Sequence, residues 1–146
     1  MKTASASMLK SQRQLLTYHD AYAYFAKHYD WTVLGAIQVS NFEDPTPKEV
    51  ASLIDQVRKV NVAAIFGSEV FPSPVLQQIG NETGIEYVDV LRDDDLPGDV
   101  GDAEHSWLGL MRFDYITMVE SLGGDATALK AVVVENTATD TARYPQ

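Results

Sequence analysis

The side chains of this sequence that could do chemistry gather where apolar segments end. His19 and Asp20 follow the apolar run 15–18, Glu69 ends the run "VAAIFGSE", and Asp93 to Asp95 follow "EYVDVL". Imidazole nitrogens and carboxylate oxygens are ligands that Zn²⁺ and Mn²⁺ accept in proteins. Three adjacent carboxylates also repel one another, and a bound cation relieves that repulsion. The pattern indicates a partial site for a divalent metal, with two or three protein ligands.

Each candidate also has an ordinary structural interpretation. His19 could cap the helix that follows it, Glu69 could contact His19 or simply precede a helix, and acidic runs are often solvated loops. His28 falls late in a predicted helix, where a cationic side chain is favourable. His105 falls in the first turn of the last predicted helix, where packing or capping is its expected role. The residue types alone leave these alternatives open.

The elements that must position these residues alternate along the chain. Thr46 followed by Pro47, and Ser73 followed by Pro74, mark the starts of two helices, because hydroxyls accept backbone N–H groups and Pro fits the first helical position. Glu49 completes a capping box with Thr46, and a glycine at position 84 ends the second helix. The spacing predicts strands at 15–18, 32–37, 62–69 and 86–91, and helices at 20–28, from 47, from 74 and at 103–122.

This alternation predicts an α/β fold, a three-layer sandwich with a four-stranded parallel sheet covered by helices on both faces. In such sheets ligands bind outside the carboxyl ends of the strands. The rule places His19, Glu69 and the acidic run at one edge of the sheet. We expect residues 1–124 to form a single lobe, with residues 1–11 flexible, and residues 125–146 to be a partly disordered tail.

Length and composition are those of one ordinary domain. The chain has 146 residues, 45% of them hydrophobic and 22% charged, with a formal net charge of −10. This charge argues against nucleic acid as a partner, because phosphate binding needs clustered Lys and Arg, and favours cations. The absence of cysteine excludes disulfides and thiolate metal sites. We find no secretory signal core and no apolar run of about 20 residues, so we expect no membrane insertion.

Common catalytic motifs are missing from the sequence. It contains no GxSxG, P-loop or GxGxxG pattern. A phosphoryl-accepting receiver domain would carry an acidic pair after the first strand and a single Asp after the third. His19-Asp20 and Ser68-Glu69 stand at these two places instead. We therefore do not expect an enzyme.

Four segments match a known family in their order and spacing. They are "TYHDAYAYFAKHY", "EDPTPKEVASLIDQVRKVNVAAIFGSEVF", "VLQQIGNETG" and "VDVLRDDDLPG" followed by "SWLGLMRFD", and they lie within residues 12–122. Through them the chain resembles the carboxyl-terminal lobe of the ZnuA/TroA-like (cluster A-I) zinc and manganese solute-binding proteins of ABC transporters. The resemblance implies one lobe of a periplasmic metal-binding protein fold.

The resemblance also implies a ligand set. In this family a transition metal lies between two α/β lobes, each of which gives two ligands, and the residues that correspond here are His19 and Asp94. The family pattern of Asp, a small residue and Leu also fits Asp89, but the distance to "SWLGLM" favours Asp94. Asp93 and Asp95 remain alternative ligands.

Function and partners follow from the same resemblance. The implied function is binding of zinc or manganese for ABC import, weak in this chain because the two ligands of an amino-terminal lobe are missing, as in a truncated or split receptor. The implied partners are a divalent metal ion and an amino-terminal lobe on another chain, a second copy of this chain, or an ABC permease. The implied location is extracytoplasmic. The competing interpretation is a structural or interaction domain that keeps the fold and no longer binds metal tightly.

Overall fold

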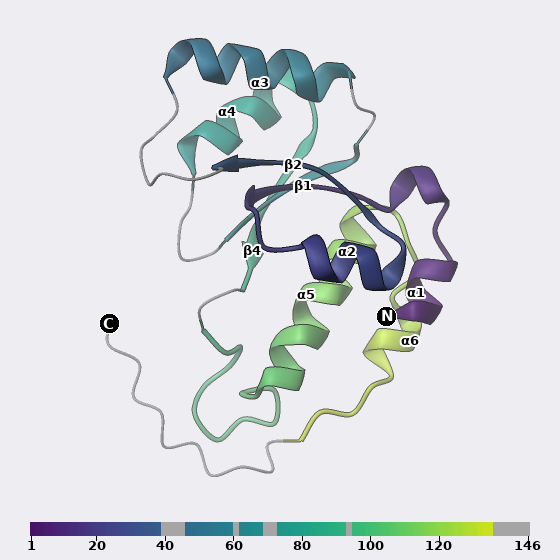
Figure 1. Cartoon of the computed structure of the whole chain (residues 1–146). Coiled ribbons are helices and arrows are strands. Elements are labelled where there is room, and N and C mark those ends of the chain that lie inside the picture. Colours follow the sequence, from purple (N-terminus) through teal and green to yellow (C-terminus); the bar gives the residue numbers. More distant parts are fainter. Residues whose placement is uncertain (39–45, 60–61, 69–72, 93–94, 136–146) are drawn as a thin grey trace.

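The computed structural model describes residues 1–38, 46–59, 62–68, 73–92 and 95–135 (Figure 1). The expectations for Glu69, Asp93, Asp94 and the end of the tail lie outside these residues. In chain order the elements are α1 Lys2–Ala6, the 3-10 helix η1 Lys10–Gln12, β1 Gln14–His19, α2 Ala23–Tyr29, β2 Thr32–Gln38, α3 Pro47–Lys59, β3 Ala64–Ser68, α4 Pro74–Thr83, β4 Glu86–Leu91, α5 Trp107–Ser121 and α6 Thr127–Lys130.

The four strands form one parallel sheet in the order β2-β1-β3-β4. Its register pairs Thr17 of β1 with Phe66 of β3. Helices α3 and α4 cover one face of the sheet, and α2 and α5 lie on the other face, with α1 and α6 beside α5 (Figure 1). The predicted three-layer α/β fold with a four-stranded parallel sheet is confirmed.

The central strands divide their side chains between two hydrophobic cores. Leu15 of β1 and Phe66 of β3 belong to the core shared with α2 and α5, whereas Leu16 and Ile65 belong to the core shared with α3 and α4. Leu15, Ile65 and Phe66 are each at most 1% exposed. Because both faces are covered, residues that point to either side of these strands are buried, as is usual in parallel sheets.

The predicted start signals of α3 and α4 are confirmed. The Thr46 N–H donates to the Glu49 carboxylate at 2.7 Å, and the Glu49 N–H donates to the Thr46 hydroxyl at 3.4 Å. Hydrogen bonding to Thr46 lowers the pKa of Glu49. The Ser73 hydroxyl accepts from the Leu76 N–H at 3.3 Å, and Gly84 ends α4 with a φ of 73°. Both helices therefore begin where side chains satisfy their first backbone donors.

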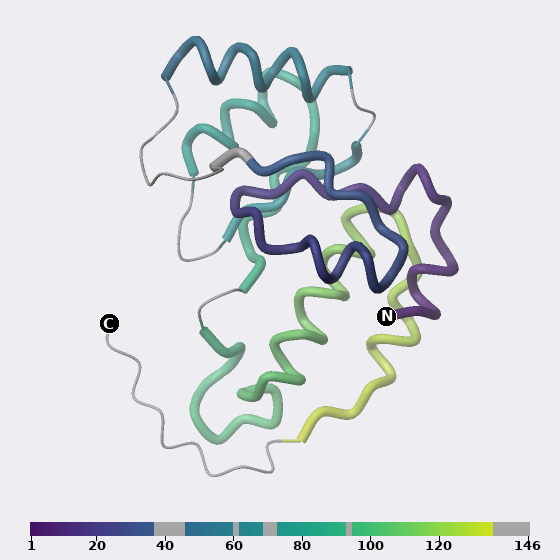
Figure 2. Tube along the Cα trace, in the orientation of Figure 1, coloured from purple at the N-terminus to yellow at the C-terminus, as the bar shows by residue number. Residues whose placement is uncertain are grey.

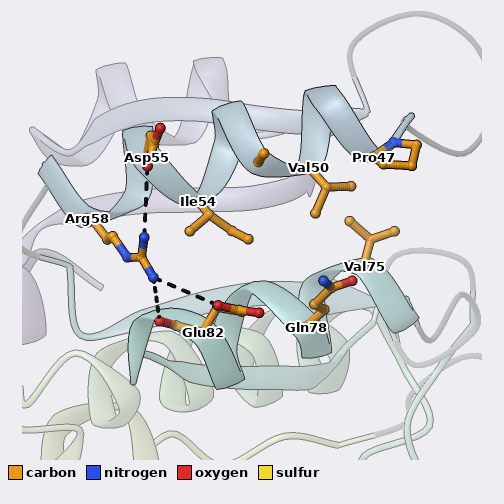
Figure 3. A pocket seen from close by; sticks show the side chains of 9 residues that line it. Pro47, Val50, Ile54, Asp55, Arg58, Val75, Gln78 and Glu82 are labelled. Carbon is orange, nitrogen blue, oxygen red and sulfur yellow. Dashed lines mark hydrogen bonds and ion pairs between the residues drawn. The ribbon is translucent and has the colours of Figure 1, made fainter.

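A groove runs between α3 and α4 on the outside of this layer (Figure 3). Apolar side chains of both helices line it, and Arg58 bridges them at one end. The Arg58 guanidinium donates to the Glu82 carbonyl at 3.1 Å and lies 3.9 Å from the Asp55 carboxylate. Because these charges are about half exposed, they stabilise little, and the buried side chains of the two helices hold the layer together.

The first and last helices of the described chain, α1 and α6, pack side by side (Figure 2). Ala4 and Met8 are 1% and 3% exposed in the core, and the Trp31 indole Nε1 donates to the Ser5 hydroxyl at 2.8 Å. Leu129 of α6 is 5% exposed in the same core. Parts of segment 1–11 and of the segment from 125 onward thus pack in the core of the lobe. The two apolar side chains Ala4 and Met8 are buried here because helix α6 offers a surface to pack on.

Helix α5, the longest described helix, begins four residues later than predicted. The Ser106 hydroxyl accepts from the Gly109 N–H at 3.1 Å and so caps the helix, which begins at Trp107. The sequence pattern alone did not distinguish this cap from the polar residues before it. No helix among the described residues has both the length and the apolar character needed to cross a membrane.

Aromatic side chains of α2 pack against α5. The Phe25 ring centroid lies 5.1 to 5.3 Å from the ring centroids of Tyr29, Trp31 and Tyr115. Tyr24 is different, because it is 90% exposed. Phe25 and Tyr29 therefore pack in the lobe, whereas Tyr24 does not.

Tyr115 should make stability depend on pH above about pH 10. Burial raises the pKa of Tyr115 to about 12, with smaller contributions from Tyr29 and Asp114. The unfolded state therefore loses this proton first, so the contribution of Tyr115 to stability is complete below about pH 10 and is lost as the pH rises towards 12. Tyr115→Phe should flatten this part of the profile by less than about 1.4 kcal/mol per pH unit, because the ring is partly exposed.

Urea unfolding between pH 9 and pH 12 would measure this effect, with Tyr24→Phe as the exposed control. Equal slopes for the parent and Tyr115→Phe would contradict the assignment.

Candidate metal centre

The carboxyl ends of three strands border a small cavity beside His19. Its lining includes Thr17 and His19 of β1, Phe66 and Ser68 of β3, and Leu91 of β4. Ser68 and Thr17 are 3% and 2% exposed, so buried hydroxyl groups lie beside the apolar Phe66 and Leu91 in its lining. This is the edge of the sheet at which the sequence predicts ligand binding.

His19 is the last residue of β1, and neighbouring side chains hold it in place. The Thr17 hydroxyl donates to the His19 carbonyl oxygen at 2.8 Å. The imidazole lies edge-on to the Tyr18 ring, with the ring centroids 4.7 Å apart. The side chain is partly exposed. A half-buried imidazole at a strand end has the access that a metal ligand needs and a backbone held by strand pairing.

Arg92, the residue that follows β4, is attached to α5. The backbone N–H of Arg92 donates to the Asp114 carboxylate at 2.9 Å, and Asp114 is 4% exposed within α5. The Arg92 guanidinium donates to the Asp95 carboxylate at 2.9 Å and to the Leu96 carbonyl at 3.1 Å. Arg92 and Asp114 thus fix the point where the chain leaves the sheet.

Two alternative carboxylates do not line the cavity beside His19. Asp95 forms the ion pair with Arg92. Asp89 is exposed within β4 and lines a different hollow, together with residues of α5 such as Thr117 and Glu120. These positions favour neither Asp89 nor Asp95 as the partner of His19.

Three candidate ligands, Glu69, Asp93 and Asp94, lie outside the described ranges, and their roles stay predictions. Within the described ranges, no group of three or more His, Asp or Glu side chains could hold a metal ion. A tetrahedral or octahedral metal needs four to six ligands. Of the two preferred ligands, His19 and Asp94, the structure describes the position of His19.

The two other histidines lie in settings that fit structural roles. His28 is exposed in the last turn of α2, where a cation is favourable. His105 is 6% exposed, and its Nδ1 lies 3.2 Å from the Pro97 carbonyl and 3.1 Å from that of Gly98. It precedes the Ser106 cap, so the expectation that it occupies the first turn of the helix is wrong.

Sequence reasoning missed Arg92 and Asp114. Their only signals are an arginine directly before an acidic run and a carboxylate in a helix that is otherwise apolar on its buried side. Neither signal identifies its partner, because 22 residues separate Asp114 from Arg92.

The fold defines the class of protein, an α/β lobe with a four-stranded parallel sheet covered by helices on both faces. The particular family follows from the sequence. The model of the family described as "Zinc-uptake complex component A periplasmic" (ZnuA) matches residues 1–121, and the chain belongs to this family.

Curated relatives are similar over part of their length. The manganese-binding lipoprotein MntA of Halalkalibacterium halodurans is 21% identical over 113 residues, and the iron-binding protein YfeA of Yersinia pestis is 26% identical over 112 residues. Both alignments cover 77% of this chain, but 37% of MntA and 36% of YfeA. The chain thus spans little more than a third of the length of these relatives.

Solved structures share the fold. The periplasmic zinc binding protein TroA from Treponema pallidum matches with a TM-score of 0.70 and 22% identity, over 83% of this chain and 45% of TroA. The Mn-bound periplasmic metal binding protein from Candidatus Liberibacter asiaticus matches with a TM-score of 0.66 and 22% identity, over 83% of this chain and 44% of the other. At this identity the likeness shows the fold alone, and it extends over slightly less than half of each structure.

Proposed function

We propose that this chain binds a transition metal, zinc or manganese, as part of a receptor for an ABC importer. His19 and Asp94 would be its ligands. The observation that carries the proposal is the position of His19 at the carboxyl end of β1, partly exposed and held through Thr17, beside a cavity shared with β3 and β4. The net charge of −10 also favours a cation as the cargo.

The choice of zinc or manganese rests on ligand chemistry. The relatives carry the printed names of manganese-, iron- and zinc-binding proteins, so membership of the family does not select among these metals. Imidazole and carboxylate ligands suit both zinc and manganese. With two ligands from this chain, water or another protein surface would fill the remaining coordination positions, and binding to this chain alone would be weak.

The remaining ligands could come from an amino-terminal lobe on another chain or from a second copy of this chain. An ABC permease would receive the metal. The family description "periplasmic" and the lipoprotein name of MntA support an extracytoplasmic location. Catalysis plays no part in this proposal.

Calorimetric titration with Zn²⁺ and with Mn²⁺ tests the proposal. The parent chain should bind at least one of these metals, and His19→Ala and Asp94→Ala should each weaken binding at least about 10-fold, since even indirect partners of metal ligands contribute 10- to 100-fold. His28→Ala is the matched control, because it removes an exposed imidazole from the last turn of α2.

Parallel titrations of Asp89→Ala, Asp93→Ala and Asp95→Ala would test the alternative carboxylates. A parent chain that binds neither metal better than the His19→Ala/Asp94→Ala double variant would favour the competing function, a structural or interaction domain that retains the fold.

A further inference from the structure

Helix α5 carries apolar side chains around its whole circumference. The lobe buries one side of the helix, which includes Leu110 and Met118. By the helical repeat, Phe113 and Ile116 lie largely on the opposite side, and both are only partly buried. Helix α3 differs, because its buried residues share one face. A helix that is apolar all around is usually covered on both sides, so the outer side of α5 has the composition of a contact surface.

Two hollows follow the outer side of α5. One, of about 420 Å³, is lined in part by Arg112, Phe113 and Ile116, and the other, of about 360 Å³, by Thr117 and Glu120 together with β4. These five residues recur at intervals of three and four and so form one continuous stripe along the helix, here called the outer stripe of α5. In the described part of the chain both hollows open to the surface.

The outer stripe carries opposite charges at its two ends. Arg112 stands four residues before Ile116, and Glu120 stands four residues after it. When two copies of the stripe meet antiparallel around Ile116, Arg112 of each copy lies opposite Glu120 of the other. The same surface thus complements itself, as an interface between identical subunits related by a two-fold axis requires.

The bonds that these two charges make within the described part of the lobe leave room for a further partner. The Arg112 guanidinium donates to the carbonyls of Leu129 at 3.2 Å and Lys130 at 3.0 Å, which uses two of its five N–H groups. The Glu120 carboxylate pairs with the Lys130 ammonium group at 2.5 Å, and both side chains are about half exposed. Such a pair stabilises little, so Glu120 can also accept from a second cation.

We propose that the outer stripe of α5 is the interface of a homodimer, in which α5 packs antiparallel against α5 of a second copy of this chain. Ile116 meets its own equivalent at the two-fold axis, and the two pairs of Arg112 with Glu120 flank this contact. Two helices alone bury less than the about 800 Å² per partner of a standard interface, so the dimer is weak and depends on protein concentration.

This dimer is separate from the candidate metal centre. Helix α5 begins on the side of the sheet where β4 ends (Figure 1). Antiparallel pairing of α5 therefore points the two edges that carry His19 in opposite directions. The second copy does not complete the metal site in this arrangement, so the inference does not rest on the proposed function, and dimerisation should be the same with and without Zn²⁺ or Mn²⁺.

Reversal of the charges tests the pairing. Sedimentation equilibrium of the full chain, up to the millimolar range and in metal-free buffer, would use about 0.15 M salt to screen the net charge of −10 on each copy. Arg112→Glu and Glu120→Lys should each raise the dimer dissociation constant at least about 10-fold, because like charges then face each other. An equimolar mixture of the two variants should recover most of the parent's affinity, since every charge again meets its opposite.

Helix α3 offers matched controls on the other face of the sheet (Figure 1). Lys48→Glu and Asp55→Lys make the same changes of charge at exposed positions of α3. Both variants should dimerise as the parent does. Thermal unfolding of each variant would confirm that it is folded.

A cysteine cross-link tests the position of the two-fold axis independently and decides the question if a charge-reversed variant does not fold. The chain contains no cysteine, so Ile116→Cys introduces a single thiol. Mild oxidation should convert most of Ile116→Cys to a disulfide-linked dimer, because the two thiols meet at the axis. Ser52→Cys, which places a thiol at an exposed position of α3, should stay monomeric under the same conditions.

A parent chain that is monomeric at every concentration would overturn the proposal. A mixture of Arg112→Glu and Glu120→Lys that associates no better than either variant alone, or equal cross-linking of Ile116→Cys and Ser52→Cys, would do the same. A dimer that forms only when Zn²⁺ or Mn²⁺ is added would also contradict this geometry, while leaving the proposed metal binding intact.

Discussion

Phe66→Ala is expected to lower the free energy of unfolding by about 3–5 kcal/mol, the range for truncating a fully buried phenylalanine. Phe66 is 1% exposed in β3, a central strand, and packs in the core shared with α2 and α5. Its removal deletes a large apolar surface and leaves a cavity that packed neighbours cannot close. Urea unfolding followed by circular dichroism would measure the change.

Tyr24→Ala is the control for this substitution. It also removes an aromatic ring, but the Tyr24 side chain is 90% exposed, so the free energy of unfolding should change by less than about 0.5 kcal/mol. A similar loss of stability in the two variants would mean that Phe66 does not occupy the described core.

Gly109→Ala is expected to lower the free energy of unfolding by about 3 kcal/mol, the upper part of the usual range for overpacking. A Cβ at position 109 would collide with the carbonyl oxygen of Glu104, and would lie 2.7 Å from its carbonyl carbon and 2.9 Å from its Cα. These are backbone atoms of the turn that leads into α5, so no side-chain rotation can relieve the collision. Guanidinium unfolding would measure the effect.

Gly35→Ala is the matched control, because it makes the same substitution in β2 with space available. The nearest atom to a Cβ at position 35 is Leu16 Cδ1 at 4.0 Å, an ordinary contact. Stability should stay unchanged or rise slightly, since alanine loses less backbone freedom on folding than glycine does. If Gly109→Ala were equally harmless, the close approach of α5 to residue 104 would be wrong.

Local signals in the sequence predicted much of the fold. Thr46 and Ser73 each cap a helix at the predicted residue, and the strand predicted at 86–91 has these bounds in the structure. These features depend on side chains within three or four positions of one another, so neighbouring residue types suffice to identify them. The rule for parallel sheets then gives the edge at which His19 lies, because all four strands point the same way.

Contacts between distant segments could not be predicted in this way. The burial of Ala4 and Met8 depends on partners from α6 and α5, more than 100 residues away in sequence. The exposure of Tyr24 beside the partly buried Phe25 depends on which face of α2 meets the sheet and α5. Residue type gives the tendency to be buried, and the arrangement of the elements decides whether a surface is there to bury it.

The candidate site likewise combines features that follow from local sequence with contacts between distant segments. The sequence by itself determined the four-stranded α/β class, the starts of α3 and α4, and the position of His19 at a strand end, since each follows from short-range pattern and chain direction. Only the tertiary structure decided that Arg92 holds Asp95 and Leu96, and that Asp114 of α5 holds Arg92. The physical reason is that a hydrogen bond across 22 residues forms only after the helix has packed on the sheet, and no local preference of either residue encodes that partner.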